Sequence, residues 1–171
     1  MNKFQENTPL VIVGGGPVGL VLALSMQQQC LPVKVLEARK QGAAYQDKRA
    51  LALSYGSKII LEKLGVWSDV AINATAIDTI HVSQRGSVGR SKLQAEEHDL
   101  PALGYVVSYG ALMQVLDAGL DAKYVMYEAP ANSISQNEQM ATVDFTFAGE
   151  EMTLASSLLV IAEGGRGLDN I

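Results

Sequence analysis

Six residues near the start of the chain carry the clearest chemical signal. Residues 14–19 read Gly-Gly-Gly-Pro-Val-Gly and fit the pattern G-x-G-x-x-G between an apolar run and a helical pattern. The first glycine would permit a tight turn, the third a close approach to a pyrophosphate, and the last close packing of helix on strand. Amide groups at the helix start would attract the anion. The residues expected to bind a dinucleotide here are Gly14, Gly16, Pro17, Val18 and Gly19.

An acidic residue stands where a ribose would need an acceptor. Glu37 ends a second apolar run, residues 33–37, at 18 positions beyond Gly19. A carboxylate there accepts hydrogen bonds from ribose hydroxyls and repels a 2′-phosphate, so this first site favours FAD or NAD over NADP. Ala38 is expected to line the same site. The alternative interpretation of Glu37 is a solvated strand end.

These residues require a strand, a helix and a second strand to position them. The apolar run 9–13 predicts a buried strand, and a helix is expected from Pro17 to about Cys30, with Val18, Leu22 and Met26 four apart. Pro32 ends that helix before strand 33–37, which completes a parallel βαβ unit. Residues 39–49 predict a loop, and residues 57–64 a helix that ends at Gly65.

The rest of the chain predicts short strands around one more helix. Strands are expected at 76–84 and 104–107, a helix at 111–122, and a β-meander between 124 and 161. The last apolar run opens on Glu163 and Gly164, which could lie beside Gly14 in one sheet. The expected fold class is α/β: an incomplete, Rossmann-like three-layer FAD/NAD(P)-binding fold with a parallel sheet and a β-meander, forming one domain over residues 1–171.

Composition excludes several classes of function. The net charge is −5 and the 13 basic residues are scattered, which argues against nucleic acid as a partner. One cysteine and no leader-like N-terminus indicate the cytoplasm. Two histidines and one cysteine supply too few ligands for a zinc site, so no metal is expected. Ser54 and Ser57 have no histidine nearby, and we assign no catalytic side chain.

Three further segments resemble one known family. Residues 47–54, Asp-Lys-Arg-Ala-Leu-Ala-Leu-Ser, with Leu61, Leu64, Gly65 and Trp67 beyond them, resemble the R-A-x-A-L-S…L…L-G-x-W segment of ubiquinone-biosynthesis hydroxylases. These enzymes belong to the para-hydroxybenzoate-hydroxylase-like flavin monooxygenases. The resemblance implies that Arg49 approaches FAD, through its pyrophosphate or ribityl part, for which a guanidinium is suited.

Two departures from the family pattern concern the cofactor. Residues 104–112 resemble G-Y-V-V-x-x-R-x-L, but Gly110 stands in place of the arginine, so Gln114 is the expected polar contact instead. Residues 159–164 resemble the motif that leads into A-D-G-x-x-S, with Glu163 in place of aspartate before Gly164 and with Gly167 in place of serine. The resemblance implies that Glu163 and Gly164 lie near the cofactor.

The same resemblance implies a function for a longer protein. It implies a monooxygenase that uses FAD, NAD(P)H as co-substrate and oxygen to hydroxylate an aromatic ring, such as a polyprenyl phenol of ubiquinone biosynthesis. A lipid-like substrate would bring peripheral contact with the inner membrane or a multi-enzyme assembly. Residues 76–103 would join the substrate-side sheet, while the later G-D ribityl motif is missing, so we expect a fragment. An NAD-dependent dehydrogenase domain and a catalytically silent nucleotide-binding fragment are the alternatives.

Overall fold

The computed structural model describes residues 5–83 and 90–164 in two compact units. The first unit is formed by Met1–Ala44 with Leu116–Ile171, and the second by Tyr45–Val115. A turn is expected at 85–90, and its residues 85–89 lie outside the described residues. Gly167 lies outside them as well. No helix in the described ranges is long and apolar enough to cross a membrane.

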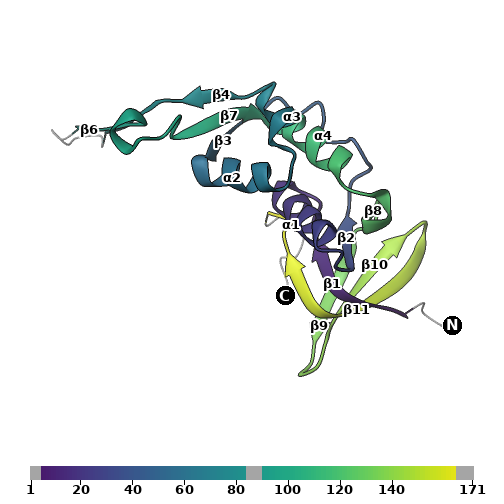
Figure 1. The fold of residues 1–171 in the computed structure, drawn as a ribbon. Helices are drawn as coiled ribbons and strands as arrows, with labels where there is room; N and C mark the ends of the chain where they lie inside the picture. The colour runs from purple at the N-terminus through teal and green to yellow at the C-terminus, as the bar shows by residue number, and fades with distance from the viewer. Residues whose placement is uncertain (1–4, 84–89, 165–171) are drawn as a thin grey trace. The chain divides into compact units, whose positions relative to one another are not determined.

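The first unit is built on a six-stranded sheet with the order β8-β2-β1-β11-β10-β9 (Figure 1). The neighbours β8, β2, β1 and β11 are parallel, and β11, β10 and β9 are antiparallel. The strands are β1 (Gln5–Val13), β2 (Val33–Glu37), β8 (Val125–Tyr127), β9 (Ala131–Gln136), β10 (Ala141–Phe147) and β11 (Glu150–Ile161). The sheet therefore combines the expected parallel βαβ strands with an antiparallel meander.

One face of the parallel strands is covered by helix α1 (Pro17–Gln28). Ile12 and Val35 are neighbours in register between β1 and β2, and both are fully buried. They lie on the same face, and the Ile12 side chain lies 3.3 Å from the position that a Cβ on Gly19 would take. The buried helix residues are Gly19, Leu20, Ala23 and Leu24.

The residues whose spacing predicts this helix do not form its buried face. Val18 is 72% exposed, and Leu22 and Met26 are only half-buried. The reason is Gly19, which lies against Gly14 and turns its own side of the helix toward the sheet. Apolar residues spaced four apart correctly predict a helix, but they do not show which face of the helix packs against the sheet.

The opposite face of the parallel strands packs against the meander. A buried cluster joins Val11 and Val13 of β1 to Val143 and Phe145 of β10. Leu154 and Leu159 of β11 both contact this cluster, although residues an odd number apart on a flat strand point to opposite faces. Strand β11 must therefore twist between Leu154 and Leu159. Helix α1, the parallel strands and the meander form three layers.

The meander begins later than predicted. Residues 124–127 were expected to open it, but β8 is a parallel neighbour of β2, with Tyr127 in register with Glu37. Among the described strands of the first sheet, only β9, β10 and β11 are antiparallel neighbours. The sequence of a three-residue strand does not show whether it pairs in a parallel or an antiparallel way. That direction depends on the connection that precedes the strand.

The second unit contains a three-stranded sheet, a hairpin and helices. The sheet order is β3-β7-β4, and β5 pairs with β6. The strands are β3 (Ala50–Ser54), β4 (Thr75–Ile77), β5 (Thr79–Ser83), β6 (Arg90–Gln94) and β7 (Gly104–Ser108). The helices are α2 (Tyr55–Lys63), α3 (Trp67–Ala71), η1 (Glu96–His98), α4 (Tyr109–Gly119), whose last residues belong to the first unit, and η2 (Ala122–Tyr124), which lies in the first unit.

Several boundaries in the second unit differ from the prediction. Helix α2 begins at Tyr55 instead of residue 57, because the Ser54 hydroxyl accepts the Ser57 amide and caps it. Gly65 follows the helix with φ +74°, as expected of a terminating glycine. Strand β3 and helix α3 were not predicted, and the strand expected at 76–84 is divided between β4 and β5.

Candidate functional site

Three parallel strands end at one edge of the first sheet. Val13 is in register with both Leu36 and Ile161. The turn after β1 is fixed on both sides, because the Gly14 amide donates to the Leu36 carbonyl (2.8 Å) and the Ala162 amide donates to the Val13 carbonyl (2.7 Å). Ligands of open α/β sheets bind at this carboxyl edge. The expected neighbourhood of the Gly14 and Gly164 turns is thus confirmed as a feature of the sheet.

Gly14 is a glycine for two physical reasons. Its φ of +108° lies in a region that side chains rarely adopt. A Cβ atom there would also lie 2.7 Å from the backbone of Ala162 and Glu163. The strand-to-helix turn can therefore pass the end of β11 only without a side chain, and Glu163 enters the site through its backbone.

The other two motif glycines differ sharply in the space around them. A Cβ on Gly19 would overlap the Gly14 carbonyl oxygen, which confirms the close packing expected there. A Cβ on Gly16 would meet only the Ala162 carbonyl oxygen, at 3.9 Å. Gly16 is also the N-cap of α1, without a side-chain cap, and Pro17 follows in the first turn. The open side of Gly16 and the uncapped helix start fit an incoming anion.

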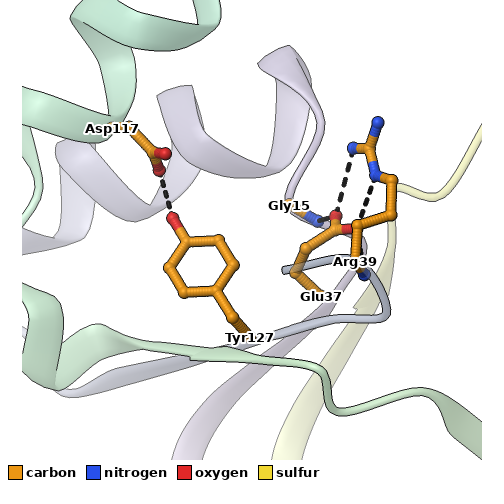
Figure 2. A network of polar contacts seen from close by, with 5 residues as sticks. All are labelled: Gly15, Glu37, Arg39, Asp117 and Tyr127. Carbon is orange, nitrogen blue, oxygen red and sulfur yellow. Dashed lines mark hydrogen bonds and ion pairs between the residues drawn. The ribbon is translucent and has the colours of Figure 1, made fainter. Parts of the chain in front are cut away.

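Glu37 is held by protein groups on both carboxylate oxygens (Figure 2). Oε2 accepts the Gly15 amide at 2.7 Å, and Oε1 accepts the amide and the Nε of Arg39 at 2.9 and 2.8 Å. Glu37 itself is 6% exposed. The interpretation of Glu37 as a freely solvated strand end is therefore wrong: its carboxylate links the strand end directly to the glycine turn.

The environment of Glu37 keeps its carboxyl ionised. Burial raises the pKa of Glu37, but the hydrogen bonds and charge of Arg39 and the Gly15 amide outweigh that effect and bring the pKa below its ordinary value. A carboxyl whose pKa is lower in the folded than in the unfolded state stabilises the fold above the unfolded pKa, about 4.3. That stabilisation is lost as the pH falls through the folded pKa.

Glu37→Gln is therefore expected to flatten the acid side of the stability profile. The free energy of unfolding, measured by urea denaturation between about pH 7 and pH 3, should fall less steeply in the variant because one native carboxylate no longer takes up a proton. The variant and the parent should converge toward the acid end. Parallel profiles over this range would contradict the assigned pKa direction.

A second polar pair lies at the same end of the unit. The Tyr127 hydroxyl donates to the carboxylate of Asp117, which is 8% exposed, as Figure 2 shows. Tyr127 extends from the strand position beside Glu37, and Asp117 lies on the last turns of α4. The pair ties this helix to the strand that borders the site.

Arg49 and Gln114 both belong to the second unit. Two nitrogens of the Arg49 side chain donate to Oδ2 of Asp47, Nε at 2.9 Å and Nη2 at 2.6 Å. Its guanidinium also stacks 4.9 Å from the centre of the Tyr109 ring. The Arg49 side chain is 61% exposed, although Nε and Nη2 are both engaged by Asp47. Gln114 is exposed on α4.

Gly110 has a structural reason to depart from the family pattern. A Cβ there would overlap the carbonyl oxygen of Tyr45 and lie 2.9 Å from that of Asp47. The Gly110 amide donates to the same Asp47 carbonyl at 2.8 Å. The loop that carries Asp47 and Arg49 thus packs directly on the start of α4, in space that an arginine would need.

Gly110→Ala is expected to destabilise the chain by about 2 kcal/mol or more, since backbone atoms would have to move. Restoring the family residue with Gly110→Arg should be at least as harmful. Gly56→Ala is the matched control: its Cβ meets only the Ser54 hydroxyl, at 3.6 Å, and alanine favours the helix by about 1 kcal/mol. Equal unfolding free energies for Gly110→Ala and the parent would refute the packing argument.

Sequence reasoning missed two members of the site. Gly15 was treated as a spacer, yet its amide binds Glu37. Arg39 was left in a loop, although an arginine two residues beyond a terminal carboxylate can reach it, and this spacing was the available signal. The structure brings together Gly14, Gly15, Gly16, Glu37, Arg39 and the Glu163 backbone. Pro17, Val18 and Ala38 adjoin them in the chain, and Gly164 is exposed beyond β11 with φ +71°.

Together these features define a dinucleotide-binding α/β unit. The model of the FAD binding domain family matches residues 7–169, and the chain belongs to this family. This family includes the flavin-dependent monooxygenases that the three sequence segments resemble. The glycine turn and Glu37 lie within the matched region.

Two curated relatives agree with this assignment. An uncharacterized protein of Synechocystis is 32% identical over 160 residues, covering 92% of this chain and 39% of the relative. The 3-demethoxyubiquinol 3-hydroxylase of Escherichia coli is 29% identical over 174 residues, covering 94% and 42%. The chain thus spans about two fifths of the length of these relatives.

Solved structures show the same fold. The p-nitrophenol 4-monooxygenase of Pseudomonas putida superposes with a TM-score of 0.76 at 20% identity, over 94% of this chain and 42% of that one. The flavin-dependent monooxygenase PieE, solved with FAD and substrate, gives 0.76 at 22% identity over 94% and 31%. The expected fold class, a mixed α/β fold with a parallel sheet and a meander, is confirmed.

Proposed function

We propose that this chain is the FAD-binding portion of a monooxygenase that hydroxylates an aromatic ring with NAD(P)H and oxygen. The observation that carries the proposal is the open side of Gly16 beside an uncapped helix start, within a chain of the FAD binding domain family. Bound FAD would supply the redox and oxygen chemistry. The side chains described here would bind and orient it.

The adenosine diphosphate half of FAD accounts for the residues of the first unit. Gly14, Gly16, Val18 and Gly19 would leave the amides of the turn and helix start accessible to the pyrophosphate, with Pro17 fixing the first turn. Glu37 would accept from the ribose and, with Ala38 beside it, exclude a 2′-phosphate. The backbone of Glu163 and Gly164 would border the same edge.

The second unit would contribute a cation and an amide. Arg49 is held on Asp47 and Tyr109 with its side chain 61% exposed, and its guanidinium would reach phosphate or flavin oxygens from there. Gln114 would be a further polar contact from α4. Residues 76–103, with the β5–β6 hairpin, would join a substrate-side sheet completed elsewhere in the whole protein.

The substrate is proposed from the relatives. The E. coli relative is named for a demethoxyubiquinol and the P. putida enzyme for p-nitrophenol, both aromatic rings that carry a hydroxyl group. The likeness to the E. coli hydroxylase favours a polyprenyl phenol of ubiquinone biosynthesis as the substrate. The whole protein would be cytoplasmic, and such a substrate would bring it to the membrane surface or into an assembly of enzymes. The alternative is a domain that binds the nucleotide without turnover.

Titration of the purified chain with FAD, NADH and NADPH tests the proposal. We expect FAD to bind in the micromolar range, detected by the visible flavin spectrum and its fluorescence, and NADPH to bind much more weakly because Glu37 opposes a 2′-phosphate. Binding of NADH without FAD would instead support a dehydrogenase domain. Failure of all three nucleotides to bind would contradict the proposal.

A further inference from the structure

We propose that Arg39 is a positioning residue that orients the Glu37 carboxylate toward a ribose hydroxyl. The proposal rests on the proposed function, in which an adenosine ribose lies at this strand end. Arg39 is not part of the glycine motif, and neither the family pattern nor the sequence spacing had assigned it a role. Its contacts in Figure 2 are what indicate one.

The hydrogen bonds to Glu37 divide unequally between its two oxygens. Oε1 receives two good donors, the amide and Nε of Arg39 at 2.9 and 2.8 Å. Oε2 receives the Gly15 amide at 2.7 Å and only a long contact of 3.4 Å from Nη2 of Arg39. A carboxylate has about four lone-pair positions, so the weakly used position on Oε2 is the one that a hydroxyl would take.

Arg39 can do this because it is anchored but outside the core. Its side chain is 46% exposed while that of Glu37 is 8% exposed, so the guanidinium closes the solvent side of the carboxylate. Its backbone is fixed as well, since the Arg39 carbonyl accepts the Glu128 amide at 3.1 Å. Because the backbone amide and Nε of Arg39 both hold Oε1, the carboxylate has little freedom to rotate away from Gly15.

The other charged groups near Glu37 are mostly acidic. Tyr127 is its register neighbour on β8, bonded to Asp117 of α4, and Glu128 follows on the same strand end. Glu163 lies at the end of β11, beside the glycine turn. Arg39 is the cation that directly contacts Glu37 among these groups. Without Arg39, burial would favour protonation of Glu37, and an acid form presents a donor where the ribose needs an acceptor.

Competition between two ligands that differ by one hydroxyl tests the role. ADP and 2′-deoxy-ADP would each displace FAD from the chain, followed by flavin fluorescence. We expect the parent to prefer ADP by about tenfold, the worth of a hydrogen bond to a charged acceptor. In Arg39→Gln the preference should fall below about threefold, and the affinity for ADP should begin to decline at a higher pH than in the parent.

Two controls separate orientation from net charge and from folding. Lys34→Gln removes a cation from the same strand, one that donates to the Lys123 carbonyl, and should leave the preference unchanged. In a Glu37→Gln background, Arg39→Gln should produce no further change, because the acceptor it orients is gone. The unfolding midpoint of each variant shows that the fold is retained.

The outcomes distinguish this inference from the function on which it rests. A parent that binds neither FAD nor ADP would overturn both. A parent that binds FAD, with the same ADP preference and the same pH profile in Arg39→Gln, would overturn the role of Arg39 and leave the proposed function standing. The expected loss of preference in Arg39→Gln, absent in Lys34→Gln, would support it.

Discussion

Gly16→Val is expected to weaken FAD binding by at least about 100-fold while the chain remains folded. The valine Cβ would meet only one carbonyl oxygen of the protein, at 3.9 Å, so the fold accepts it. Its methyl groups would instead fill the space on the open side of the turn, which the pyrophosphate must enter. Equilibrium titration with FAD measures the loss, and far-UV circular dichroism with urea denaturation checks the fold.

A second substitution at the same position removes unfolding as an explanation. Gly16 is the N-cap of α1 with an extended backbone, at φ −74° and ψ −179°, and it has no capping side chain. Serine is a good N-cap, so Gly16→Ser should stabilise the chain by a few tenths of a kcal/mol. Its hydroxyl would occupy the same amides as the phosphate, and FAD affinity should fall. Unchanged affinity in both variants would show that the ligand lies elsewhere.

Gly19→Ala is expected to destabilise the chain by about 3 kcal/mol or more. Intrinsic helix propensity alone would favour alanine by about 1 kcal/mol, so the sign of the change is diagnostic. The reason is steric: the new methyl group would overlap the Gly14 carbonyl oxygen and press on the Ile12 side chain, at 3.3 Å. Helix α1 would have to move away from β1.

Gly16→Ala provides the matched control for that measurement. It adds the same methyl group three residues earlier, where the nearest atom is 3.9 Å away, and should cost about 1 kcal/mol through the weaker N-cap. The two free energies of unfolding, from urea denaturation, should therefore differ by about 2 kcal/mol. Similar values for both variants would mean that Gly19 does not make the close approach.

The βαβ unit was predictable from the sequence because its signals are local. The apolar runs, the glycines and Pro17 each act within a few residues of where they stand, and β2 has the predicted bounds. The face of α1 was not predictable from spacing alone. It depends on how Gly19 meets Gly14, which is a contact between two elements.

The remaining differences also arise from tertiary contacts. Ala50–Ser54 was interpreted as a family motif because its exposed alternation is weak, and its pairing with Gly104–Ser108 makes it a strand. Gly110 was expected to be a lost cofactor contact, and the carbonyl of Tyr45 explains its identity. Arg39 belongs to no motif, and its spacing from Glu37 is a weak signal that the structure turns into a direct contact.

Backbone amide mapping tests the central claim most directly. The claim is that phosphate oxygens bind the amides of the turn and first helical turn after β1. In ¹H–¹⁵N correlation spectra of the labelled chain titrated with ADP, the largest shifts should fall on Gly16, Val18 and Gly19, with a response at Gly14, Gly15 and Arg39. Saturating shifts confined to other residues, with these amides unmoved, would contradict the account.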